Sequence, residues 1–181
     1  MREGQYQQQR VLYVISCGSP VAQLVPELVI QAQTLNWNVC VIATPQGTKF
    51  LDIKSIERIT CHPIRSEYKH PDEPDMLPQA DALIAFPATF NTLNKWALGI
   101  TDTLAVGLLC EYTGLKKPII AVPVTGEGLS YHPALLRSIR MLRRCGVHVL
   151  YEPEVSPLAQ NDPVAVILSA LERHLPPLLE R

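Results

Sequence analysis

Short continuous runs of apolar residues alternate along the chain with longer segments in which apolar residues recur every three or four positions. The continuous runs predict buried strands at 11–16, 38–44, 58–62, 80–86, 118–123 and 147–151, of which 58–62 is the weakest. The spaced segments predict helices at 21–35, 47–52, 91–98, 102–113, 132–146 and 163–175. Strands that are apolar throughout and separated by helices are typical of a parallel sheet covered on both faces. We therefore expect an α/β fold, a three-layer Rossmann-like domain with a six-stranded parallel sheet.

No repeat and no linker composition interrupts this alternation. The polar start, MREGQYQQQR, predicts a flexible tail at 1–10, which leaves 11–181 as a single domain. Four prolines and several charges fall within 63–79, so this segment predicts a loop rather than a helix.

Composition narrows the function classes. With 47% apolar residues and a net charge of −1, the chain predicts a globular protein without a nucleic-acid partner. No apolar run approaches the roughly 20 residues of a membrane span, and the start does not resemble a signal peptide. The five cysteines lack metal-binding spacing, so we expect reduced thiols and no metal site. These features predict a cytoplasmic protein without a membrane partner.

Polar residues gather where predicted strands give way to predicted helices, at 17–20, 44–48 and 87–92. Ligands of parallel sheets bind at the carboxyl ends of strands, where free backbone N–H groups favour an anion. The candidate ligand contacts there are Gly18, Ser19, Pro20, Thr44, Thr89, Phe90, Asn91 and Thr92. Helix capping is the alternative role at any single turn. Three such turns on one edge favour a phosphate-bearing ligand, although the chain has neither GxGxxG nor GxxxxGK[ST].

The segment PATFNTLNKWALGITDTL, at 87–104, resembles the signature of the flavin-containing cysteine decarboxylase family. That family includes phosphopantothenoylcysteine decarboxylases and lantibiotic peptidyl-cysteine decarboxylases. Its usual form is Pro-Ala-Ser/Thr-x-Asn-Thr-hydrophobic-x-Lys, followed by Gly-Ile-x-Asp-Asn-Leu. The matching residues are Pro87, Ala88, Thr89, Asn91, Thr92, Lys95, Gly99, Ile100, Asp102 and Leu104. Thr103 is the one break, and the resemblance extends from the strand at 11 to the strand at 147.

The resemblance implies that the ligand is FMN and that it lies between the subunits of a homotrimer or a multiple of trimers. It also implies that the turn at 89–92 contacts the flavin, with Asn91 near the reactive face. The helix that carries Lys95 and Trp96, together with Asp102, is then expected to form much of the subunit interface.

Several positions depart from the decarboxylases of this family. Glu73 stands where they carry a catalytic histidine, and the nearest histidine, His70, lies three residues earlier in the proline-rich loop. Gly126 replaces the asparagine that holds the substrate carboxylate, and Ser130 replaces a tryptophan. Gln160 stands where phosphopantothenoylcysteine decarboxylases have a cysteine that supplies a proton. The standard cysteine decarboxylase machinery is therefore expected to be missing.

We expect an FMN-binding oxidoreductase or decarboxylase-like enzyme that acts on an unidentified small substrate, with His70 and Asn91 as catalytic candidates. The alternative is a flavin-binding regulatory or subunit protein without catalysis. His132 either starts a helix or lines the altered substrate segment. His148 is interpreted as structural, and the arginines at 137, 140, 143 and 144 as a solvated helix face.

Overall fold

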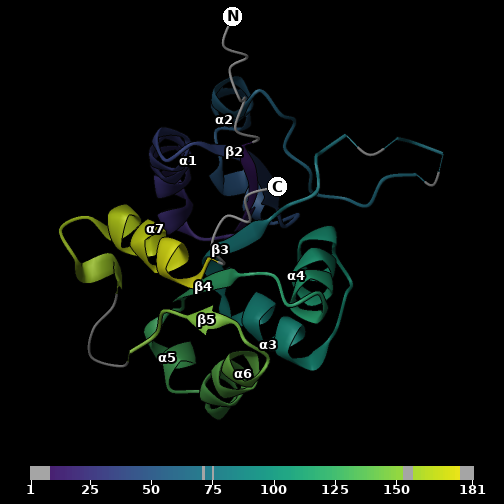
Figure 1. Cartoon of the computed structure of the whole chain (residues 1–181). Coiled ribbons are helices and arrows are strands. Elements are labelled where there is room, and N and C mark those ends of the chain that lie inside the picture. Colours follow the sequence, from purple (N-terminus) through teal and green to yellow (C-terminus); the bar gives the residue numbers. More distant parts are fainter. Residues whose placement is uncertain (1–8, 71, 75, 153–156, 176–181) are drawn as a thin grey trace, which may run out of the picture.

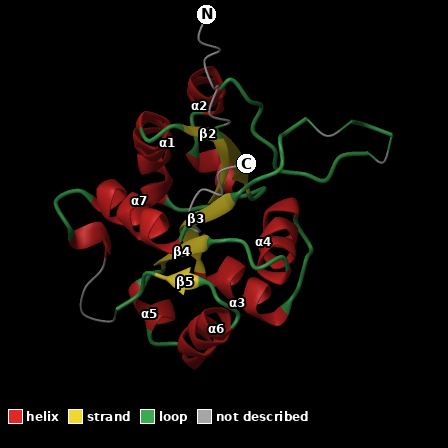
Figure 2. Cartoon of the chain, viewed as in Figure 1, coloured by secondary structure: helices red, strands yellow, loops and turns green. Residues whose placement is uncertain are grey.

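The computed structural model describes residues 9–70, 72–74, 76–152 and 157–175. Within these ranges five strands form one parallel sheet in the order β2-β1-β3-β4-β5 (Figure 1 and Figure 2). The strands are β1 (Arg10–Ser16), β2 (Trp37–Ala43), β3 (Ala82–Thr89), β4 (Ile119–Val124) and β5 (His148–Val149). The prediction of a Rossmann-like α/β fold with a parallel sheet is confirmed.

Helices cover both faces of the sheet and produce the expected three layers (Figure 1). One face is covered by α1 (Val25–Thr34), α2 (Ile53–Thr60) and α7 (Pro163–His174). The other is covered by α3 (Phe90–Leu98), α4 (Leu104–Gly114) and α6 (Pro133–Arg144). Short connecting helices complete the description: η1 (Pro20–Leu24), η2 (Gly47–Phe50), α5 (Glu127–Ser130) and η3 (Pro157–Ala159).

Two core clusters lie on opposite faces of the sheet. Along β1, Tyr13 and Ile15 point into one cluster and Leu12 and Val14 into the other, as the two-residue period of a strand requires. Each cluster contains one of the two tryptophans. The indole N–H of Trp96 donates to Thr113 Oγ1 at 3.0 Å, and that of Trp37 donates to Glu172 Oε1 at 3.1 Å.

The predicted strand at 58–62 is wrong, because most of it is the last turn of α2. Asp52 accepts a hydrogen bond from the Ser55 N–H and so starts the helix, while Ile56 and Thr60 lie buried on one face. In place of a sixth strand, the described residues show an isolated parallel bridge between Ile42 and Arg65. Apolar and β-branched residues four apart on one helix face resemble a short strand when they are read locally.

Other boundaries also shifted. β3 runs through Pro87 to Thr89, with a register shift against β4 between Ala85 and Ala88. β5 is limited to two residues of the strand predicted at 147–151. The predicted tail at 1–10 lies mostly outside the described residues, and Arg10 belongs to β1. Among the described helices, none combines the length and apolar character that a bilayer crossing requires.

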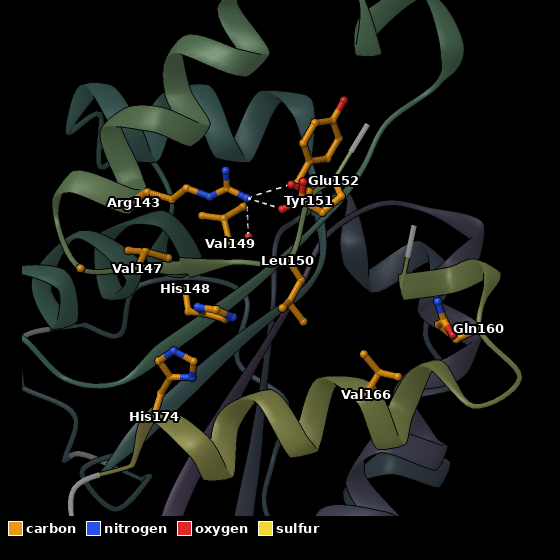
Figure 3. Close-up of a pocket in the computed structure, with 11 residues that line it drawn as sticks. Arg143, Val147, His148, Val149, Leu150, Tyr151, Glu152, Gln160, Val166 and His174 are labelled. Atoms are coloured by element: carbon orange, nitrogen blue, oxygen red, sulfur yellow. Dashed lines mark hydrogen bonds and ion pairs between the residues drawn. The ribbon is translucent and has the colours of Figure 1, made fainter. Parts of the chain in front are cut away.

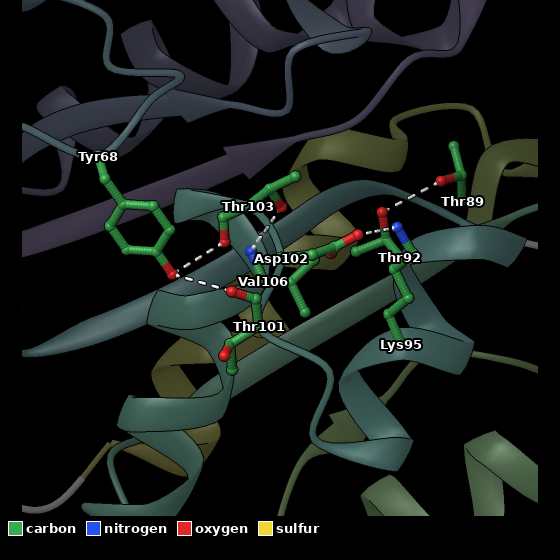
Figure 4. Close-up of polar contacts among 8 residues, drawn as sticks. All are labelled: Tyr68, Thr89, Thr92, Lys95, Thr101, Asp102, Thr103 and Val106. Atoms are coloured by element: carbon green, nitrogen blue, oxygen red, sulfur yellow. Dashed lines mark hydrogen bonds and ion pairs between the residues drawn. The ribbon is translucent and has the colours of Figure 1, made fainter.

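The described residues between α2 and β3 form a loop that extends from the body of the molecule (Figure 1). The Tyr68 hydroxyl lies 3.3 Å from the carbonyl oxygens of both Thr101 and Thr103, and it therefore holds the loop against the start of α4 (Figure 4). The hydroxyl also lies directly over Gly107, where an added Cβ would come within 2.1 Å of it.

Replacing Gly107 by alanine should release this anchor with little change in global stability. The new methyl group displaces the flexible end of Tyr68, while alanine improves the helix propensity of α4 by up to about 1 kcal/mol. We expect faster tryptic cleavage after Lys69 and a free energy of unfolding within about 1 kcal/mol of the parent. Gly114→Ala is the matched control, because an added Cβ there meets nothing within 4 Å. Equal cleavage rates in the two variants would contradict the anchor.

The cysteines differ sharply in their exposure, and this difference can be measured. Cys17 and Cys40 are buried, whereas Cys61 and Cys145 are exposed. Burial raises the pKa of the Cys17 thiol and raises that of Cys40 to about 12, so neither is a thiolate at neutral pH. Mass spectrometry after iodoacetamide treatment of the folded protein should show labelling of Cys61 and Cys145. Cys17 and Cys40 should become labelled only after denaturation, and rapid native labelling of Cys17 would refute its burial.

Candidate functional site

The carboxyl ends of β1, β2 and β3 bring three polar turns together at one edge of the sheet. The Thr44 N–H donates to the Ser16 carbonyl at 2.9 Å, and the Cys17 N–H donates to the Pro87 carbonyl at 3.2 Å. An added Cβ on Gly47 would lie 2.5 Å from the Ser16 oxygen. The turns after β1 and β2 are therefore in direct contact, and a glycine at 47 is needed for this approach.

Side-chain capping accounts for two of the three turns. Ser19 Oγ accepts from the Val21 N–H at 3.4 Å, and Thr44 Oγ1 accepts from the Gly47 N–H at 3.0 Å. Thr89 occupies the N-cap position of α3, yet its side chain caps no backbone N–H group. Its hydroxyl donates instead to Thr92 Oγ1 at 3.2 Å (Figure 4). The first turn of α3 thus keeps backbone donors for a ligand.

A short chain of polar contacts joins the turn after β3 to the turn after β1. The Cys17 thiol donates to Thr92 Oγ1 at 3.2 Å, so the same oxygen receives contacts from both Cys17 and Thr89. Both Cys17 and Thr92 are buried. Burial raises the pKa of Cys17 more than the hydrogen bond to Thr92 lowers it, so Cys17 remains a neutral thiol. Its role is to position the turn rather than to act as a nucleophile.

Asn91 and Phe90 begin α3 and face different surroundings. Asn91 is exposed, and its amide makes no hydrogen bond to the residues that the structure describes. The Phe90 ring contacts His132 edge to face, with centroids 5.4 Å apart. His132 is the N-cap of α6, where its Nδ1 accepts from the Ala134 N–H at 3.1 Å. The helix-start interpretation of His132 is therefore confirmed.

His70 lies in the projecting loop, apart from the polar turns. Its side chain is 69% exposed, and its Nδ1 lies 3.2 Å from Asp72 Oδ2. Its backbone N–H donates to Glu73 Oε2 at 3.3 Å, so its contacts are local. Within the described part of the chain, no hydrogen bond or ring contact joins His70 to Asn91.

The segment after β4 forms a second part of this edge. A pocket of about 430 Å³ lies over it, with Val124, Thr125, Ser130 and Tyr131 in its wall. Gly126 precedes α5 and presents no side chain. The Ser130 hydroxyl donates to the Glu127 carbonyl, so it is occupied within its own turn. Thr125 and Tyr131 therefore supply the hydroxyls of this segment that have no hydrogen bond to the described residues.

The remaining signature residues join helices to each other. The Lys95 ammonium pairs with the Asp102 carboxylate, which ties the end of α3 to the segment before α4 (Figure 4). Thr103 Oγ1 accepts from the Val106 N–H and caps α4. Trp96 points into the core, so the subunit interface predicted for this helix rests on its other side chains.

Two features of the molecule were not anticipated from the sequence. Ser16 Oγ is fully buried at the end of β1 and has no hydrogen-bond partner among the described residues. A second pocket, of about 650 Å³, lies along β5 and contains His148 and Arg143. Neither position carries a motif, and only the juxtaposition of elements distant in sequence reveals them.

Comparisons with known proteins agree on one family. The chain is similar to a cysteine/cysteine sulfinic acid decarboxylase from an unknown prokaryotic organism, with 34% identity over 82 residues. That match covers 45% of this chain and only 22% of the relative. A probable phosphopantothenoylcysteine decarboxylase of Streptococcus mutans serotype c is 24% identical over 159 residues, which cover 84% of this chain and 87% of the relative.

Solved structures share the fold. The FMN-dependent cysteine decarboxylase TvaF from thioviridamide biosynthesis superposes with a TM-score of 0.72 at 21% identity, covering 91% of this chain and 97% of the other. The epidermin biosynthesis protein EpiD from Staphylococcus aureus superposes with a TM-score of 0.64 at 28% identity, with coverage of 80% and 82%. The model of the Flavoprotein family matches residues 1–172. The chain therefore belongs to the Flavoprotein family.

Proposed function

We propose that the protein binds FMN at the carboxyl edge of β1, β2 and β3 and uses it to decarboxylate a small carboxylic acid oxidatively. The observation that carries this proposal is the uncapped start of α3, where Asn91 is exposed and free to reach a ligand. Membership of the Flavoprotein family supports FMN as that ligand. The matched relatives and structures named as cysteine decarboxylases support the reaction class.

The residues present fit the chemistry of FMN. Ser19, Thr44, Thr89 and Thr92 bring four hydroxyl groups to neighbouring turns, and backbone N–H groups of α3 remain uncapped. Hydroxyls and backbone donors bind phosphate without a paired cation. The buried Ser16 Oγ adds a further unused polar atom at this edge. Gly18 and Pro20 flank Ser19 and Phe90 follows Thr89, so all the expected contacts belong to the turns that follow β1, β2 and β3.

Each side chain in this region has a distinct task in the proposed reaction. When bound, FMN supplies an acceptor for a hydride, which permits oxidation of a thiol-bearing substrate before carbon dioxide leaves. The Asn91 amide can donate to and accept from polar atoms of the ligand, so it orients the reacting groups. The Cys17–Thr92–Thr89 contacts keep that turn in place.

Proton transfer is a task for which the three polar turns at 17–20, 44–48 and 87–92 provide no histidine. A base with a pKa near neutrality is best suited to take the thiol proton, and histidine provides one. The His70 side chain is 69% exposed, which leaves it accessible to a neighbouring copy. We propose that the protein is a homotrimer or a multiple of trimers and that the loop at 63–79 delivers His70 across the subunit contact.

A second candidate is a flavin-binding regulatory or subunit protein without catalysis. Gly126 has no side chain to hold a substrate carboxylate, and the Ser130 hydroxyl is occupied by the Glu127 carbonyl. These two observations favour binding without turnover. Flavin reduction by a substrate would distinguish the enzyme from this alternative.

FMN should bind to the purified protein in a way that depends on Asn91. Binding should shift the absorbance maximum of FMN and quench its fluorescence. Both changes should saturate at micromolar concentrations. Asn91→Ala should weaken binding roughly fivefold, as expected for one lost hydrogen bond of about 1 kcal/mol. Asn161→Ala, at an exposed asparagine before α7, should leave the affinity unchanged. An unchanged affinity in Asn91→Ala would contradict the placement of the ligand.

Phosphopantothenoylcysteine and peptides that end in cysteine should not reduce the bound flavin at an appreciable rate. Positioning of the carboxylate contributes heavily to the rate of such a reaction, and Gly126 has no side chain to hold it. The measurement is anaerobic mixing while the visible flavin absorbance is followed. Rapid bleaching with release of carbon dioxide, abolished in His70→Asn, would reject this expectation and identify His70 as the base.

Assembly can be tested separately by light scattering. We expect a mass of three chains or a multiple of three, because a site shared between subunits requires closed symmetry. A monomer at micromolar concentration would rule out delivery of His70 by a neighbouring copy.

A further inference from the structure

A pocket lies along the open edge of the sheet, away from the turns that follow β1, β2 and β3. It encloses about 650 Å³ and is bounded by β5, the end of α6 and α7 (Figure 3). Residues 146–152 form its floor in an unbroken run. Arg143 lines the pocket from α6 on one side of β5, while His148 of β5 and His174 of α7 lie together on the other side, so polar side chains from three elements border this open edge (Figure 3).

The backbone at this edge is already satisfied by a side chain. Arg143 Nη2 donates to the carbonyl of Val149 at 3.0 Å and to the carbonyl of Tyr151 at 2.8 Å (Figure 3). These are carbonyls through which an added strand would pair. Because Arg143 occupies them, the pocket is better suited to a small molecule than to an extended peptide.

Two histidine rings form one wall of the pocket. His148 and His174 stack with centroids 3.9 Å apart and an interplanar angle of 34° (Figure 3). His174 Nδ1 lies 2.7 Å from the Ala170 carbonyl, so this nitrogen carries the hydrogen and Nε2 remains open. Neither ring nitrogen of His148 has a hydrogen-bond partner in the part of the chain that the structure describes. The wall therefore holds unused nitrogen atoms.

The electrostatic surroundings of these rings are positive. Burial lowers the pKa of His148, and the positive charges of His174, Arg173 and Arg143 lower it further. These charges come from α7 and α6, the two helices that flank β5. The acidic side chain in the wall, Glu152, lies 3.7 Å from Arg143 but is 72% exposed. Glu152 therefore offsets the positive charge of Arg143 only partly, since solvent screens an exposed pair.

A metal ion is a poor match for this arrangement. Nitrogen lone pairs lie in the plane of each imidazole, and the planes of two stacked rings run alongside each other rather than converge on one point. Zinc sites need about four ligands in a tetrahedral arrangement. Among the described residues, no group of three or more histidine, cysteine, aspartate or glutamate side chains is placed to hold a metal.

We propose that this pocket is a second small-molecule site, which takes an anionic ligand through a carboxylate or phosphate group held by His148, His174 and Arg143. A bound anion neutralises part of the positive charge of the surrounding side chains. Its arrival favours uptake of a proton from solvent by His148, which then becomes a charged donor. Anion affinity should consequently rise as the pH falls. The site is independent of the proposed FMN site and of the chemistry there.

Sulfate is the first probe, because its charge stays constant across the range in which histidine titrates. Nuclear magnetic resonance of the histidine ring protons should show saturable shifts of His148 and His174 as sulfate is added at constant ionic strength with chloride. The affinity should increase by about tenfold for each unit of decrease in pH while one proton is taken up. Inorganic phosphate and succinate, titrated in the same way, distinguish a phosphate ligand from a carboxylate ligand.

Three variants test the assignment in opposite directions. His148→Gln should weaken sulfate binding at least about fivefold and flatten its pH dependence, because a charge-assisted donor is lost. Arg143→Gln should also weaken it, with Arg144→Gln as the matched control on the exposed side of α6. Glu152→Gln should strengthen binding about two- to threefold, because it removes the carboxylate that competes for Arg143. His70→Gln should change nothing.

The direction in which each variant changes the sulfate affinity decides the test. Saturable shifts, weakened by His148→Gln and strengthened by Glu152→Gln, establish the anion site. Shifts that grow linearly with sulfate and are the same in all variants would overturn it, as would binding that is insensitive to pH. Thermal unfolding of each variant without anion checks that Arg143→Gln retains the fold; if it does not, His148→Gln and Glu152→Gln still decide the outcome.

Discussion

The close approach of the turns after β1 and β2 is the constraint on which the carboxyl edge depends. Gly47 permits it, because a side chain there would collide with the Ser16 carbonyl. The Cys17 N–H then reaches the Pro87 carbonyl, and the Cys17 thiol reaches Thr92. Three turns that are far apart in the sequence are thereby fixed relative to one another. A ligand at this edge meets a surface whose shape is set by backbone contacts rather than by flexible side chains.

The two polar regions of the molecule differ in their physical character. At the carboxyl edge the donors are hydroxyls and backbone N–H groups, and the Lys95 ammonium is already paired with Asp102. Along β5 the donors are cations and imidazoles. The first kind of site relies on preorganised dipoles, whereas the second changes its charge with pH and is more sensitive to ionic strength. The two proposed sites would therefore recognise anionic groups by different physical means.

Local sequence patterns were sufficient to predict the layers of the fold and the turns at its carboxyl edge. Continuous apolar runs located β1, β2 and β4, since both faces of these strands are covered. The pattern failed at 58–62, where α2 places Ile56 and Thr60 four residues apart on one buried face. The sequence interpretations of His148 as structural and of Arg143 as part of a solvated helix face did not place the two residues at a common pocket. Those two residues acquire a common environment only when β5 packs beside α6, which no local pattern encodes.

Candidate roles for single residues were harder to derive than their positions. Thr89 sits where a helix cap is expected, yet its hydroxyl turns to Thr92. Capping preference cannot reveal that choice, because Thr92 Oγ1 also receives the Cys17 thiol from the turn after β1, a contact between residues distant in sequence. His70 likewise satisfies a sequence spacing only loosely, and its loop is held by Tyr68 against the start of α4.

The placement of the tryptophans has an optical consequence. Trp37 and Trp96 lie in different core clusters, on opposite faces of the sheet, and each indole has its own polar partner. Intrinsic fluorescence therefore contains one reporter for each layer of helices. Replacing either tryptophan by phenylalanine leaves a single emitter, which makes it feasible to see whether the two layers separate from the sheet together or in succession.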